Sequence, residues 1–565
     1  MNGDREKIYS NEYADFILNY NGDMSILELY RDTDINIINY FFAVVHFPVG
    51  QMSEDIVSKV GYSSLPLLFG LESEASMEAS GIPSIRNVPS FNLKGKGVLI
   101  GIADSGIDYT NPIFQYADKT TRIARIWDQT IVSENKQEGL VYGTEYTREQ
   151  INEAIVNIDP YSIVPSKDDI GHGTMVAGIA AGNEVPESGF YGVAPDSELV
   201  IVKLKPAKPY LKKFFRVPDS VIAYQENDII YGIQYLLNYA IEVNKPIVIC
   251  IAIDTSQYAH DSRNLTSTWL SFQASYPGIA ILLPAGNEGN TGRHYTGWID
   301  ESTRADTVEL NVGANESGFT MEFWGMSPNI FTLDILSPSG EYIPKLDFRY
   351  NETRRIAFLF DATVIYADNQ TVELGSGEQL IMLRFSNPAQ GIWRFKIYSR
   401  GIFPIRFDLW LPMNDFITYN TYFIKPNPNT TLLSLACTTN PITVTAYNPE
   451  SNGLYINAGR GYTRSDLIKP DIAAPGVNLI SPSLDHGFYQ VTGTSAAVAH
   501  TSGVSALLFE WGIVNGNFPN MNSVDMKIFM IRGAKRIANI KYPNQDWGYG
   551  ILDLFNIFNS IRSGV

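Results

Sequence analysis

The chain has 565 residues, of which 45% are hydrophobic and 18% are charged. This is the composition of a globular protein, and it excludes a chain that is disordered throughout. At about 150 residues per domain, the length predicts three or four units. The net charge of −18 argues against nucleic acid as the main partner, because phosphate backbones require clustered Lys and Arg. It argues equally against an anionic membrane surface.

Hydropathy and cysteine content set two further limits. The charged residues 1–7 are not followed by an apolar stretch, so we expect no signal peptide. No apolar run approaches the roughly 20 residues of a membrane helix, so we expect no membrane insertion. Cys250 and Cys437 both lie in apolar contexts, which predicts buried small side chains rather than a disulfide framework.

Residues 1–74 are predicted to form a small α/β unit. Segments 14–19 and 38–47 have the length and apolar character of strands, and 54–60 is predicted to be a short helix. The polar, small-residue stretch 72–80 is predicted to be an exposed linker.

A larger α/β unit is predicted over residues 75–303. Its continuous apolar runs are typical of buried parallel strands; they cover 98–104, 200–204, 247–253 and 279–283. Helices are predicted at 174–181 and 226–243 between them, and this alternation favours an α/β fold with a parallel sheet.

The pattern changes over residues 304–425. Short alternating segments are separated by Pro, Gly and Asn turns, which predicts a β-sandwich or jelly roll. α/β character returns over 426–565, with helices predicted at 496–511 and 523–532. The β unit is therefore predicted to be an insertion within the α/β domain.

Three short segments carry the ingredients of nucleophilic acyl transfer. Asp104 ends the first predicted strand, while His172 and Ser495 each open a predicted helix. Catalytic groups of open α/β sheets gather at the carboxyl ends of the strands. A serine hydroxyl needs an imidazole to accept its proton, and a buried carboxylate orients that imidazole.

Asn287 supplies a fourth component. It lies in Pro-Ala-Gly-Asn-Glu-Gly (284–289), directly after a predicted buried strand. An amide N–H aimed at a developing oxyanion contributes roughly 3–4 kcal/mol to catalysis. Each motif alone is weak evidence, but their order and their matching secondary structure favour a common site.

These segments, together with Ile-Ala-Ala-Pro-Gly at 472–476, resemble the subtilases, the subtilisin-like serine proteases of peptidase family S8, whose triad runs Asp, His, Ser. The resemblance implies a subtilisin-like parallel sheet flanked by helices and a serine endopeptidase that needs no cofactor. It implies that Asp104 orients His172, that His172 is general base and then acid, that Ser495 attacks and that Asn287 donates to the oxyanion. It also implies that the substrate-binding residues are Ala252, Ile253, Asp254, Ala285 and Gly286.

A closer resemblance is to the Csp germination proteases of clostridial spore formers. It rests on 92–101, 143–152, 259–261 and 493–500. It implies an N-terminal prodomain at 1–74 that acts as chaperone and inhibitor, a jelly-roll insert at 304–425, and the pro-form of a spore-cortex lytic enzyme as substrate within the spore. The alternative is a catalytically silent Csp-like pseudoprotease that acts as a germination sensor or scaffold. An α/β-hydrolase esterase is discarded, because its triad runs in the opposite order.

Two expectations concern details of the site. Subtilases commonly have Gly where this chain has Asp254, which either faces the cleft and alters specificity or turns outward at its rim. Removal of the prodomain is expected by self-cleavage near residue 74, within 71–77. The acidic pairs 168–169 and 300–301 lack the spacing of a calcium loop, so no metal site is predicted.

Overall fold

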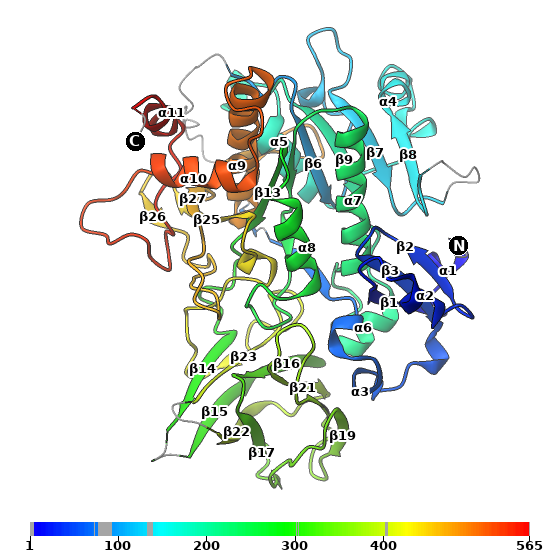
Figure 1. Cartoon of the computed structure of the whole chain (residues 1–565), viewed down its shortest axis with the longest axis vertical. Coiled ribbons are helices and arrows are strands. Elements are labelled where there is room, and N and C mark those ends of the chain that lie inside the picture. Colours follow the sequence, from blue (N-terminus) through cyan, green and yellow to red (C-terminus); the bar gives the residue numbers. More distant parts are fainter. Residues whose placement is uncertain are drawn as a thin grey trace.

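The computed structural model describes residues 5–72, 74–76, 93–132, 139–300, 302, 304–401 and 405–563 (Figure 1). Its centre is a nine-stranded sheet with the order β26-β25-β13-β11-β6-β9-β7-β8, in which β27 also pairs with β25. The inner pairs are parallel, and only β8 and β26 at the two ends run antiparallel to their neighbours. The strands are β6 (Leu99–Asp104), β7 (Ile123–Asp128), β8 (Thr144–Thr147), β9 (Glu198–Lys203), β11 (Ile247–Cys250), β13 (Ile279–Pro284), β25 (Ile442–Asn448), β26 (Gly453–Leu454) and β27 (Ile472–Pro475).

Helices cover both faces of this sheet, which explains why its strands are apolar on both sides. In β6, Ile100 and Ile102 pack into the core on the side of α5 and α9, whereas Leu99 and Ala103 face the side of α7 and α8. The expected mixed α/β fold is thereby confirmed. The helices of this domain are α4 (Arg148–Ile155), α5 (His172–Ala181), α6 (Pro209–Phe215), α7 (Glu226–Glu242), α8 (Leu265–Gln273), α9 (Thr494–Phe509), α10 (Ser523–Gly533) and α11 (Leu554–Ser563).

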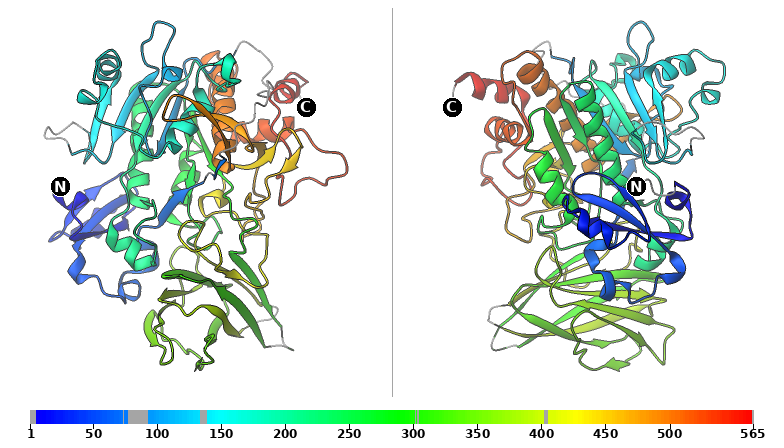
Figure 2. Two further views of the ribbon diagram at one scale, coloured as in Figure 1. Left: turned by 180° about the vertical axis from the view of Figure 1, so that it is seen from behind. Right: turned by 45° about the vertical axis from the view of Figure 1, so that its right-hand side comes forward.

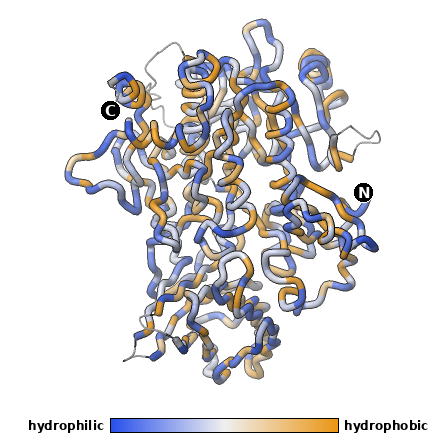
Figure 3. Tube along the Cα trace, in the orientation of Figure 1, coloured by the Kyte–Doolittle hydropathy of each residue, from blue (hydrophilic) through white to orange (hydrophobic). Residues whose placement is uncertain are grey.

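Helix α9 continues through a π-helical turn to Val514. By length and composition alone, Thr494–Val514 could cross a membrane, but 78% of its apolar window is buried inside the structure. Figure 3 shows apolar segments in every part of the trace. The apolar character of α9 is therefore explained by its place in the core.

The N-terminal unit is a three-stranded antiparallel sheet with the order β1-β3-β2 and short helices. Its apolar face joins the core on the α7 side of the central sheet, and Figure 2 shows it beside α6 and α7. Two strands, β4 and β5, then lead away from it. The elements are α1 (Arg5–Tyr9), β1 (Tyr13–Asn19), α2 (Met24–Glu28), β2 (Asp34–Ile37), β3 (Phe42–Pro48), α3 (Ile56–Val60), β4 (Leu68–Leu71) and β5 (Glu74–Ser76). Residues 77–80 of the expected linker lie outside the described residues.

The third unit consists of two antiparallel sheets that share one apolar core. Their orders are β14-β23-β16-β21-β20-β19 and β18-β17-β22-β15-β24. The strands are β14 (His294–Ile299), β15 (Ala305–Val312), β16 (Gly318–Gly325), β17 (Ile330–Leu336), β18 (Tyr342–Ile343), β19 (Glu352–Ala357), β20 (Val364–Gln370), β21 (Gln379–Ser386), β22 (Gly391–Arg400), β23 (Ile405–Trp410) and β24 (Tyr422–Phe423).

The boundary expected at 303/304 needs correction, because β14 already pairs along its whole length with β23 of this unit. The sequence of β14 hides this membership. Its burial does not alternate regularly, and Gly297 is a poor strand former that is used here because a Cβ would lie 2.0 Å from the Phe407 ring.

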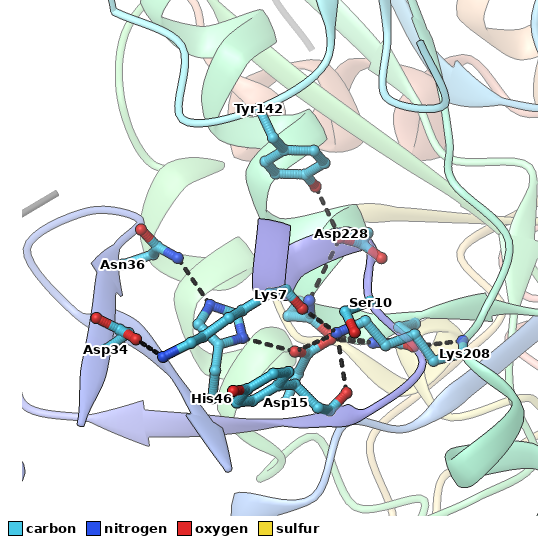
Figure 4. A network of polar contacts seen from close by, with 12 residues as sticks. Lys7, Ser10, Asp15, Asp34, Asn36, His46, Tyr142, Lys208 and Asp228 are labelled. Atoms are coloured by element: carbon cyan, nitrogen blue, oxygen red, sulfur yellow. Dashed lines mark hydrogen bonds and ion pairs between the residues drawn. The ribbon is translucent and has the colours of Figure 1, made fainter. Parts of the chain in front are cut away.

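A buried ionic network holds the N-terminal unit on the α/β domain (Figure 4). Asp15 of β1 accepts hydrogen bonds from His46 Nδ1 at 2.7 Å and from Lys208 Nζ at 2.8 Å through one oxygen. Its other oxygen accepts from Gln225 Nε2 at 3.1 Å. Burial alone would raise the pKa of Asp15, but the His46 bond and the Lys208 charge outweigh it and lower the pKa to about 2. This carboxylate therefore stabilises the docked unit above about pH 4, and the contribution is lost as the pH falls towards 2.

We expect Lys208→Met to loosen this contact, because a hydrogen bond to a charged group is worth about 1.5–3 kcal/mol. Amide hydrogen exchange of β1 and β3 should accelerate by roughly 10- to 150-fold. The matched control is Lys59→Met in the same unit. The Lys59 side chain is 55% exposed beside Asp55, so its loss should change exchange less than about fivefold. Equal effects of the two changes would contradict the assignment.

Candidate active site

Asp104 and His172 meet at the carboxyl end of β6. His172 Nδ1 lies 2.8 and 2.9 Å from the two carboxylate oxygens of Asp104, and both side chains are buried. With Nδ1–H donating to the carboxylate, Nε2 carries the lone pair that can accept a proton. Nε2 has no hydrogen-bond partner among the described residues.

Asp168 fixes the start of α5, from which His172 projects. Its Oδ1 accepts from the backbone N–H groups of Ile170 and Gly171, and its Oδ2 accepts from the N–H and the hydroxyl of Thr174. These bonds satisfy donors that a helix N-terminus otherwise leaves free. Asp168 is therefore a structural cap here, and no sequence spacing indicated this role.

Ser495 and Asn287 converge on one backbone carbonyl, that of Glu72. The Glu72 oxygen accepts from Asn287 Nδ2 at 2.8 Å, from Ser495 Oγ at 2.8 Å and from Ser495 N at 3.4 Å. Asn287 Oδ1 in turn accepts from the N–H of Thr494 at 3.1 Å and from its hydroxyl at 3.2 Å, which points the amide N–H₂ at the carbonyl. A helix N-terminus and a side-chain amide thus surround a carbonyl oxygen as an oxyanion hole requires.

The chain itself passes through this site. Before Glu72, β4 is the middle strand of a three-stranded antiparallel sheet, between β10 (Tyr224–Gln225) and β12 (Ile253–Asp254). After it, β5 pairs with β29 (Phe488–Thr492), which also pairs with β28 (Leu479–Pro482). The carbonyl that Asn287 and Ser495 contact belongs to Glu72, and the bond that follows Glu72 lies within the expected range 71–77.

The Glu72 side chain is buried in acidic surroundings. It is 2% exposed, and its Oε1 has no hydrogen-bond partner among the described residues. Burial, and then the negative charges of Glu288 and Asp254, raise the pKa of Glu72 well above its ordinary value. The pocket therefore favours an uncharged side chain at this position.

Asp254 corresponds to neither of its two expected orientations. It is fully buried, and its carboxylate accepts from the backbone N–H groups of Thr255, Leu435 and Ala436 at 2.7–3.0 Å. Burial raises its pKa to about 7, while these three N–H donors act in the opposite direction. Asp254 thus ties the substrate-side strand to the chain that returns from the β-sandwich.

The other expected substrate-binding residues divide into two groups. Ile253 and Asp254 pair through their backbones with Leu71 and Gly70. Ala252 packs in the core on the α9 side, Ala285 packs against Leu432, Ala436 and Cys437, and the N–H of Gly286 donates to Thr494 Oγ1 at 3.2 Å. The Gly286 bond connects the segment 284–289 to the start of α9.

Among the described residues, the structure contains neither a candidate metal-binding cluster nor a disulfide. No group of three His, Cys, Asp or Glu side chains there could hold a metal ion. Cys250 and Cys437 are free and buried.

Comparison with known proteins agrees with this geometry. The model of the subtilase family matches residues 95–314 and 420–550, more than half of the chain. The structure of the Clostridium perfringens CspB protease is similar, with a TM-score of 0.75 and 30% identity over 85% of this chain and 95% of that one.

Curated relatives are more distant. The subtilisin-like protease SBT1.9 of Arabidopsis thaliana is 24% identical and covers 81% of this chain. A C5a peptidase of Streptococcus pyogenes serotype M6 is 23% identical over 74% of this chain. The chain spans 61% and 34% of the length of these two relatives. The family match and the CspB similarity together establish that the chain belongs to the subtilase family of serine proteases.

Proposed function

We propose that the protein is a serine endopeptidase that cuts its own chain after Glu72. The observation that carries this proposal is the Glu72 carbonyl, which lies between Asn287 Nδ2 and Ser495 Oγ at 2.8 Å from each. A substrate carbonyl must occupy this position for acyl transfer, and here residues of the same chain occupy it.

The chemistry follows from the residues present. Ser495 Oγ forms a bond to the Glu72 carbonyl carbon while its proton passes to His172 Nε2, and the oxyanion is stabilised by Asn287 Nδ2 and the N–H of Ser495. The bond to Ser73 N then breaks, and that nitrogen takes the proton from His172. Water, deprotonated by His172, attacks the ester carbonyl. Ser495 Oγ then leaves with the proton from His172, and Glu72 is released as a carboxylic acid. Asp104 stabilises the imidazolium in both steps.

The N-terminal unit is proposed to be a prodomain that folds on the protease and delivers its C-terminal segment into the site. Two further contacts support this role: Leu67 N–H donates to Glu226 and Leu68 N–H donates to Gln257, at 3.1 and 2.7 Å. The inserted β unit is proposed to be a jelly roll that clamps the prodomain. Its buried Arg384 pairs with Glu54 of the N-terminal unit, and its Glu322 accepts from the hydroxyl of Tyr62 at 2.5 Å.

For the biological role, we propose the activation of a spore-cortex lytic proenzyme during germination, within the spore. The support is the 30% identity with the CspB protease over most of both chains and the sequence resemblance to germination proteases. The observations favour activity over a silent sensor, since His172 bonds Asp104 and both Asn287 and Ser495 bond the Glu72 carbonyl.

Intact-mass analysis and N-terminal sequencing of the purified chain test the proposal. We expect two fragments, one ending at Glu72 and one beginning at Ser73. A chain that stays whole after prolonged incubation, or a new N-terminus elsewhere than Ser73, would contradict the cut proposed here.

The carboxyl group of Glu72 makes the cut dependent on pH. Because the pKa of Glu72 is raised in the site, the docked segment favours the neutral acid, and docking weakens as the pH rises from about 4.5 through the raised value. Glu72→Gln removes the charge and keeps the shape. We expect the cleavage rate of the Glu72→Gln chain, divided by that of the unaltered chain, to increase with pH by at most about tenfold per pH unit. Measuring both rates at each pH cancels every pH effect that the two chains share, and a ratio that stays constant from pH 5 to 9 would contradict the mechanism.

A further inference from the structure

A loop of the inserted β unit covers the strand that enters the active site. The loop 411–417 follows β23, and its Met413 and Phe416 are each only 3% exposed. Both belong to the core cluster that also contains Leu68 and Phe69 of β4. The inserted unit therefore places two side chains beside β4, the strand that leads to Glu72.

Gly70 of β4 lies directly beneath these two side chains. A Cβ on Gly70 would lie 2.9 Å from Met413 Cε, 3.0 Å from its Sδ and 3.2 Å from Phe416 Cε1. The flexible end of Met413 can move away from a single Cβ, but the Phe416 ring lies closer than an ordinary van der Waals contact. A branched side chain adds atoms that the packed surroundings have less room to accept. Gly70 is not among the glycines with positive φ. Its backbone conformation therefore does not require glycine, and the limited space for a side chain is what favours glycine.

The loop is tied to the catalytic machinery. The backbone N–H of Asn414 donates to Glu288 Oε1 at 2.8 Å, and Glu288 directly follows Asn287. Leu411 N–H donates to the Arg293 carbonyl at 2.9 Å. These bonds hold the backbone of the loop in place, so any relief of a clash at Gly70 must come from the Met413 and Phe416 side chains.

We propose that Met413 and Phe416 of the inserted unit determine specificity by closing the subsite for the third residue before the cut. Together they favour glycine at this position and disfavour branched side chains. The inference rests on the proposed cut after Glu72, which places Gly70 third from the cut bond. It gives the inserted unit a role in selecting peptide substrates. The favoured substrate is an extended segment with glycine two residues before the residue whose carbonyl is attacked.

The test compares self-cleavage rates of full-length chains that carry Gly70→Ala or Gly70→Val, each with Met413 and with Met413→Ala. We expect Gly70→Val to slow the cut at least tenfold and Gly70→Ala to slow it less. Met413→Ala in the Gly70→Val chain should restore the rate to within about threefold of Met413→Ala alone. Gly50→Val is the matched control, because a Cβ at Gly50 meets nothing within 4 Å, and its rate should equal that of the unaltered chain.

A second measurement does not need cleavage. The same pairs are made with Ser495→Ala, and amide exchange of β4 is followed. Gly70→Val should raise exchange at least tenfold and Met413→Ala should reverse this, even if the proposed self-cleavage fails. The proposal is overturned if the Gly70→Val chain is cut and protected like the unaltered chain, or if Met413→Ala rescues neither the rate nor the protection.

Discussion

The Ser495→Ala chain is expected to remain in one piece where the unaltered chain is cut after Glu72. Loss of the nucleophile lowers kcat by about 10⁶-fold in another subtilase, so no cleavage should be visible over days. The reason is structural: Ser495 Oγ is the hydroxyl that hydrogen-bonds the Glu72 carbonyl, at 2.8 Å. Intact mass against time measures the first-order rate in both chains.

The control for this experiment lies on the same helix. Ser505→Ala removes a buried hydroxyl that only caps the Thr501 carbonyl at 2.8 Å, so its chain should be cut at the unaltered rate. His172→Ala should match Ser495→Ala, and the double change should be no slower than either, since the two residues act as a unit. Cleavage after Glu72 that persists in Ser495→Ala would assign the cut to a contaminating protease.

The parts of the fold that the sequence predicts well are those with a strong local signal. The run at 98–104 became β6 (Leu99–Asp104), and the periodic segment at 226–243 became α7 (Glu226–Glu242), because burial on both faces and on one face leave different patterns. β14 and the two-residue strand β10 were not predicted. They are defined by their partners in space, and two residues carry no periodicity.

The same division applies to the site. Asp104, His172, Asn287 and Ser495 were predicted because each lies within a recognisable motif that ends or follows a strand or opens a helix. The roles of Glu72 and Asp168 were not predicted. Glu72 enters the oxyanion hole through its backbone carbonyl, which any residue possesses, and Asp168 acts on N–H groups whose positions only the folded chain defines.

Asp254 shows a further limit of sequence reasoning. Both expected orientations assumed that a charged side chain replacing Gly must face solvent or substrate. The structure instead uses it as an acceptor for N–H groups of residues 435 and 436, far along the chain. Burial of a carboxylate is tolerated when such donors satisfy it. These donors come from a distant part of the chain, so the local sequence does not predict them.

Asn287→Ala should lower the self-cleavage rate by about 10²–10³-fold while the cut stays after Glu72. Removal of one oxyanion donor has this effect in another subtilase, and here Asn287 Nδ2 donates to the Glu72 carbonyl at 2.8 Å. Thr494→Val is the matched comparison. It removes the hydroxyl that helps to orient Asn287 but leaves the Thr494 N–H bond to Asn287 Oδ1 at 3.1 Å, so the loss should stay below about tenfold. An Asn287→Ala rate within tenfold of the unaltered chain would mean that the Ser495 N–H and the α9 terminus stabilise the oxyanion alone. Equal losses in both variants would mean that the orientation of the amide, and not its presence, controls the rate.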